Sequence, residues 1–117
     1  MYKFEKLKVW NEALVLAQQC YEIGLKMPRY EQNGLSDQLR RASTSVLLNI
    51  AEGSGSDTDK DFARFLLLSR KSLFESVALL KFIEKVYNNI PLNDVYIQTE
   101  LVGKLLNGLI KKLKSNS

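Results

Sequence analysis

No proline or glycine interrupts residues 58–88, which form the longest unbroken helical pattern in the sequence. Apolar residues recur there every three or four positions, as on one face of an α-helix, from Phe62 through Leu66 and Leu73 to Leu80. Such a helix spans about 45 Å at 1.5 Å per residue. Because the chain has only 117 residues, most of the remainder must pack alongside this helix. The pattern favours a helical bundle.

Three further segments show the same period, and no strand-like alternation competes with it. The four predicted helices span residues 9–26, 36–53, 58–88 and 93–114. Ser36 is a suitable N-cap for the second helix, a Gly/Ser-rich break from Gly53 ends that helix, and Asp57 or Thr58 can cap the third. Since short breaks join antiparallel neighbours, we expect one all-α domain over residues 1–117, an up-down-up-down four-helix bundle.

The second predicted helix is apolar on two sides. Leu39, Val46 and Ile50 share one stripe, and a rotation of 100° per residue places Leu47 and Leu48 about 120° to 140° from its middle. These two leucines are therefore predicted to point away from the core of a single bundle.

The third predicted helix repeats this feature, because Leu67, Phe74 and Phe82 lie beyond about 120° from its main stripe. A soluble monomer rarely exposes so large an apolar cluster, whereas a symmetric homo-oligomer would cover it. The five residues of the two helices are thus the predicted oligomer interface. The alternative is a skewed monomeric bundle whose wide core wraps around residues 58–88.

The chain contains no histidine, which excludes catalytic triads, His-dependent zinc sites and Glu-x-x-His di-iron sites. Cys20 is the only cysteine and has no partner base. Asp57, Asp59 and Asp61 follow the spacing of a calcium loop, but Phe62 and Leu68 replace its required Gly and Glu. Helix capping explains these aspartates better. We predict no catalytic residue, no metal site and no cofactor.

Positive charge is the remaining candidate for function. The chain carries 17 Lys and Arg against 13 Asp and Glu, a net charge of +4, and no acid follows Glu100. Cations on a rigid helical surface can bind nucleic acid through backbone phosphates. The predicted contacts with RNA or DNA are Arg40, Arg41, Arg64, Lys71, Lys104, Lys111 and Lys112. The alternative is an ordinary solvated surface without a ligand.

Two carboxylates, Glu52 and Glu75, are predicted to be partly buried and to form structural ion pairs with Arg40, Arg41 or Arg64. Arg40 and Arg41 are accordingly divided between pairs at subunit contacts and ligand binding. The N-terminus lacks the apolar core of a signal peptide, and no long uncharged apolar run occurs. We expect a cytoplasmic protein without membrane contact.

Several motifs in order along the chain resemble the 23S rRNA-intervening-sequence protein family. The matching stretches are "VWNEALVLAQQCYEI", "NGLSDQLRRASTSVLLNIAEGSG" and "FARFLLLSRKSLFESVALL". The shared positions are Val9, Trp10, Gly34, Leu35, Gln38, Arg40, Arg41, Ala42, Asn49, Ile50, Ala51, Glu52, Gly53, Phe65, Leu66, Ser72, Leu73 and Glu75. One departure is "SGSD" from Ser54, where the family often has an Arg.

The resemblance implies a bacterial, non-enzymatic protein that forms ring-shaped homopentamers of four-helix bundles and binds nucleic acid. Accessory proteins of diversity-generating retroelements look similar, and they bind a reverse transcriptase as well as nucleic acid. The resemblance therefore also implies an alternative role, a scaffold or accessory subunit for a polymerase.

Overall fold

The computed structural model describes residues 1–116, and within them the fold is entirely helical. Its four α-helices are α1 (Lys8–Lys26), α2 (Leu35–Ser54), α3 (Asp59–Val86) and α4 (Asn93–Ser115). Two short 3-10 helices, η1 (Lys3–Lys6) and η2 (Arg29–Glu31), precede α1 and α2. Each α-helix begins and ends within two residues of its predicted bounds.

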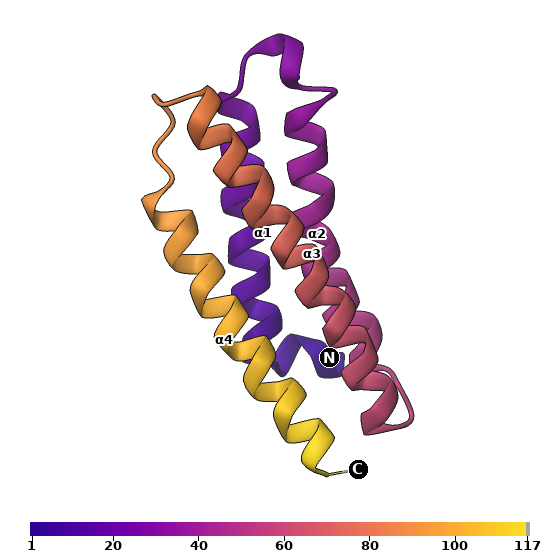
Figure 1. Cartoon of the computed structure of the whole chain (residues 1–117). Helices are drawn as coiled ribbons and strands as arrows, with labels where there is room; N and C mark the ends of the chain where they lie inside the picture. The colour runs from indigo at the N-terminus through magenta and orange to yellow at the C-terminus, as the bar shows by residue number, and fades with distance from the viewer. Residues whose placement is uncertain (117) are drawn as a thin grey trace.

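The four helices form a bundle in which each contacts two neighbours. α1 packs against α2 and α4, and α3 packs against the same two helices, so α1 and α3 lie on opposite sides of the core. Figure 1 shows the 27–34 and 87–92 connections at one end of the bundle, and the 55–58 connection with both termini at the other. The molecule measures 46 × 22 × 20 Å, and α3 nearly spans its long axis.

The start of α2 differs from the prediction. Gly34 is the N-cap, and Ser36 lies inside the first turn, where its fully buried hydroxyl donates a hydrogen bond to the Gly24 carbonyl of α1 at 2.9 Å. The predicted Ser36 cap is therefore wrong, because the hydroxyl joins two helices. At the start of α3, Thr58 is the cap, and its Oγ1 accepts a hydrogen bond from the Asp61 backbone N–H at 3.1 Å.

Gly53 has a packing role that its predicted function as a helix terminator missed. It lies within α2, and no glycine among residues 1–116 has a positive φ. A Cβ built at Gly53 would lie 2.6 Å from the Cβ of Phe65 and 2.9 Å from Cδ1 of Phe62. Only glycine allows α2 and α3 to approach this closely.

Small polar residues continue the close α2–α3 contact along the bundle. The Ser69 hydroxyl, which is fully buried, donates to the Val46 carbonyl at 2.7 Å, and Ser72 donates to the Ser45 hydroxyl at 2.9 Å. These bonds satisfy buried hydroxyl groups while the short side chains keep the helices close. α2 and α3 thus form the most closely packed pair of the bundle.

Large aliphatic side chains fill the space between the four helices. The fully buried ones include Leu16, Leu39, Ile50, Leu66, Leu80, Ile83 and Leu106. Cys20 lies among them as a free thiol, and burial raises its pKa to about 12 although a hydrogen bond with Ser43 opposes that shift. A thiol that stays protonated is a poor nucleophile, so Cys20 acts as a small core residue.

Among residues 1–116, no helix combines the length and apolarity required to cross a bilayer.

Candidate nucleic-acid interface

The excess positive charge of the chain lies on two neighbouring helices. α3 and α4 together contain ten of the 17 Lys and Arg residues and six of the 13 Asp and Glu residues. This excess of four positive charges equals the net charge of the whole chain. In α1 and in α2, by contrast, two basic residues are balanced by two acidic residues. The net positive charge of the chain therefore lies on the side of the bundle formed by α3 and α4.

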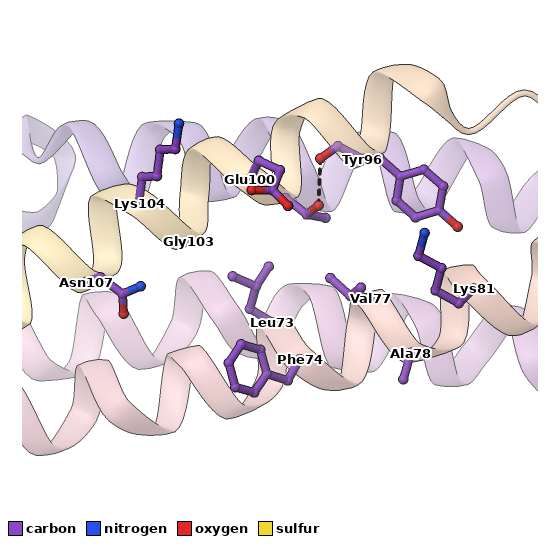
Figure 2. Close-up of a pocket in the computed structure, with 11 residues that line it drawn as sticks. Leu73, Phe74, Val77, Ala78, Lys81, Tyr96, Glu100, Gly103, Lys104 and Asn107 are labelled. Carbon is purple, nitrogen blue, oxygen red and sulfur yellow. Dashed lines mark hydrogen bonds between the residues drawn. The ribbon is translucent and has the colours of Figure 1, made fainter.

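A groove of about 590 Å³ runs between these two helices. Figure 2 shows Leu73 and Val77 of α3 pointing toward α4, opposite the bare backbone of Gly103. The lining residues are Leu73, Phe74, Val77, Ala78, Lys81, Tyr96, Thr99, Glu100, Gly103, Lys104 and Asn107. The floor of this α3–α4 groove is therefore apolar, and its rim carries two lysines and one glutamate.

Cationic side chains bridge the two helices at both ends of the α3–α4 groove. At one end, the Arg70 guanidinium donates from Nη1 to the Oδ1 of Asn107 at 2.9 Å. At the other end, Lys81 reaches across to Tyr96, and its Nζ lies 4.2 Å from the ring centroid (Figure 2). Burial, with the charge of Glu84 and a hydrogen bond to it, raises the pKa of Tyr96 to about 12. The tyrosine therefore stays a neutral donor.

A second hollow, of about 400 Å³, lies where α3 begins and α4 ends. Lys60 and Arg64 of α3 and Lys114 of α4 line it together with a single acid, Asp61. The Nε of Arg64 donates to Oδ1 of Asp61 at 3.0 Å, but both side chains are largely exposed, so this pair contributes little to stability. Cations from two helices thus converge at this end of the bundle.

The predicted phosphate contacts divide into two groups. Five of them, Arg64, Lys71, Lys104, Lys111 and Lys112, are exposed on α3 or α4. The structure places Lys104 on the rim of the α3–α4 groove and Arg64 in the second hollow, whereas the other three line neither. The prediction from charge alone therefore stays a prediction, and it did not anticipate the two hollows between α3 and α4.

Arg40 is engaged within the chain. It is half-buried, its Nη2 donates to the Gln32 carbonyl at 3.0 Å, and its guanidinium lies 5.6 Å from the centroid of the Tyr21 ring. A Cβ at Gly24 would lie 3.2 Å from its Nη1, so Arg40 also covers this glycine of α1. These contacts give Arg40 a structural role within the chain, and its predicted role in ligand binding stays a prediction.

Arg41 forms an ion pair, but its partner within the chain is neither Glu52 nor Glu75. The Nε of Arg41 pairs instead with Oδ2 of Asp37 at 2.9 Å, one turn earlier on the exposed surface of α2. Glu52 and Glu75 are exposed, and neither forms an ion pair within the described part of the chain. Local i,i+4 spacing on the helix decided the partner of Arg41.

Two of the five predicted interface residues are largely covered by the chain itself. Leu47 and Leu67 are half-buried and pack against the core of their own chain. Leu48, Phe74 and Phe82 are 53%, 66% and 57% exposed. Phe74 belongs to the edge of the α3–α4 groove, while Leu48 and Phe82 lie on the outer faces of α2 and α3.

Sequence reasoning missed two features of the α3–α4 groove. Lys81 follows Phe74 by seven residues, a spacing that puts both on one side of a helix and could have indicated their association. Gly103 lies in the middle of a helix, where glycine is unfavourable unless packing or a ligand requires it.

Within residues 1–116, no three His, Cys, Asp or Glu side chains form a group able to hold a metal ion.

A family model described as 23S rRNA-intervening sequence protein matches residues 5–108. The chain belongs to this family. The match covers all of α1, α2 and α3 and most of α4. No curated protein matches the chain.

Family motif residues at the α1–α2 and α2–α3 contacts have packing roles in this member of the 23S rRNA-intervening sequence protein family. Gly53 permits the close approach of α2 and α3, and Arg40 covers Gly24 and bonds to the segment before α2. The "SGSD" departure falls where α2 ends and the 55–58 connection begins. The exposed lysines of α4 come after the family motifs in the sequence, and together with the cations of α3 they form the basic surface.

Proposed function

We propose that the protein binds RNA or DNA through backbone phosphates on the surface formed by α3 and α4. The observation that carries this proposal is that these two helices hold the entire net positive charge of the chain. Phosphate binding without sequence readout needs cations on a rigid surface and no catalytic group. Lys104 and Lys111 are the strongest candidates for contacts on α4, because both are exposed and lie two turns apart on one side of the helix.

We further propose an up-down-up-down topology and assembly into a homo-oligomeric ring, with five subunits as the family resemblance implies. The alternating positions of the connections support the topology. Exposed apolar side chains on the outer faces of α2 and α3, Leu48 and Phe82, support the assembly. Five chains of charge +4 would give a ring of charge +20, which would attract a polyanion far more strongly than one chain.

Fluorescence anisotropy with labelled RNA and DNA tests nucleic-acid binding directly. The affinity should fall steeply as salt rises from about 50 to 200 mM, because bound phosphates release their counterions. Absence of binding to both probes at the lowest salt concentration would contradict the proposal.

A second candidate function is a scaffold or accessory subunit for a polymerase such as a reverse transcriptase. Exposed apolar residues outside the α3–α4 groove favour it, since Leu25 is 60% exposed and Ile97 is 68% exposed. Light scattering and anisotropy together distinguish the two functions. A complete oligomer that binds neither RNA nor DNA at low salt would favour the scaffold.

A further inference from the structure

We propose that the α3–α4 groove binds single-stranded nucleic acid, with one unpaired base stacked on Phe74. The inference rests on the proposed function and assigns it a strand type and a site. Three properties of the groove support it: an exposed aromatic ring at the edge, an open apolar floor, and cations at the rim and ends.

The Phe74 ring is available for stacking. It is 66% exposed at the edge of the groove. Its ring contacts no other aromatic ring and no cation within residues 1–116, unlike Phe65, which lies under Arg64. Exposed aromatic rings beside cationic grooves are what proteins use to hold unpaired bases without reading their sequence.

Gly103 keeps the wall opposite Phe74 open. A Cβ at this position would meet only Cδ2 of Leu73, at 3.6 Å, which is an ordinary contact. Packing within the chain therefore does not require glycine, although glycine in the middle of a helix lowers helix propensity. The missing side chain leaves space above Leu73 and Val77 for a flat apolar group (Figure 2).

The charges around the groove suit a polyanion. Lys81 and Lys104 lie on the rim of the groove. Arg70 lies at one end of the groove, where it donates a hydrogen bond to Asn107. Glu100 is the one acid among the lining residues. In Figure 2 the Lys104 ammonium points away from α3, where it can meet a phosphate outside the groove while the base enters.

The width of the groove selects an unpaired strand. Packed helices lie about 8–10 Å apart, so a duplex cannot reach the floor between them, and its bases are already stacked on one another. A single strand can place one base against Phe74 without first losing a base pair. Duplex can therefore contact only the surrounding lysines.

The experiment compares Phe74→Ala with Tyr30→Ala, since both rings are exposed but Tyr30 lies on η2, outside the groove and the proposed subunit contacts. Anisotropy is measured with a labelled unstructured single strand and with a duplex of the same sequence. Phe74→Ala should weaken single-strand binding about tenfold, the loss of one base–aromatic stack. Tyr30→Ala should leave that affinity unchanged, and Phe74→Trp should retain it.

Equal affinity for the two probes, with Phe74→Ala matching the wild type, would overturn this inference while leaving the proposed function intact. Failure of both probes to bind at low salt would overturn the proposed function and the inference together. Light scattering tests whether a second copy of the chain, rather than nucleic acid, occupies the groove. A fall in oligomeric mass on Phe74→Ala would mean that a second copy of the chain fills it, which also overturns the inference.

Discussion

At the scale of single residues, the adjacent arginines Arg40 and Arg41 have different roles. Arg40 is half-buried, and it joins α2 to α1 through the Tyr21 ring and to the segment after α1 through the Gln32 carbonyl. Arg41 is exposed and bonds only to Asp37, within its own helix. Two side chains that look equivalent in sequence therefore differ because only one of them faces another helix.

This difference predicts the effect of each arginine on stability. Arg40→Ala should lower the free energy of unfolding by about 1–2 kcal/mol, because it leaves a carbonyl without its charged donor. Arg41→Ala should change it by less than about 0.5 kcal/mol, as expected for an exposed i,i+4 pair. Urea unfolding followed by circular dichroism measures both. Equal stability of the two variants would contradict the structural role of Arg40.

At the scale of elements, glycines determine how closely helices approach. Gly53 lies against Phe62 and Phe65 of α3, where a Cβ would come within 3.0 Å of both side chains. Gly108, in the middle of α4, has nothing within 4 Å of a built Cβ. The same residue type is thus required in α2 and dispensable for packing in α4.

The two glycines should therefore respond oppositely to the same substitution. Gly53→Ala should destabilise the protein by about 1–3 kcal/mol, because the extra methyl group forces α2 and α3 apart. Gly108→Ala should stabilise it by about 0.5–1 kcal/mol through helix propensity alone. Thermal and urea unfolding provide the comparison. A Gly53→Ala variant as stable as the wild type would show that α2 and α3 can separate without loss.

The four helices could be predicted from sequence because their apolar periods are long and their breaks are short. Contacts between helices could not be predicted, because they depend on which helices become neighbours. Ser36 is of a residue type that commonly caps helices, yet its hydroxyl donates a hydrogen bond to the Gly24 carbonyl across the α1–α2 contact. Leu47 and Leu67 lie far from the centre of their own stripes, but each helix has two neighbours, so a wider arc of its surface packs against the core.

At the scale of the whole molecule, the surface divides into a basic side on α3 and α4 and apolar positions on the outer faces of α2 and α3. The net charge and the absence of histidine could be read from sequence. The α3–α4 groove could not be predicted from sequence, because it depends on Gly103 of one helix lying opposite Leu73 of another.

Assembly predicts a specific loss of mass. Leu48→Asp should reduce the oligomer to smaller species, because a carboxylate buried at a subunit contact lacks a partner. Ile97→Asp is the matched control, since Ile97 is also exposed but lies on α4. Size-exclusion chromatography with light scattering reports the mass. Retention of full oligomeric mass by Leu48→Asp would show that the outer face of α2 is not a subunit contact.

The most direct test of the central claim is the salt dependence of nucleic-acid binding in two double variants. Lys104→Gln with Lys111→Gln removes two cations from α4, and Lys8→Gln with Lys26→Gln removes two exposed cations from α1. If α3 and α4 bind the phosphates, the α4 variant should reduce the slope of log affinity against log salt by about 1.4 for a single strand. The α1 variant should keep the wild-type slope. Equal slopes in the two variants would contradict binding through the α3–α4 surface.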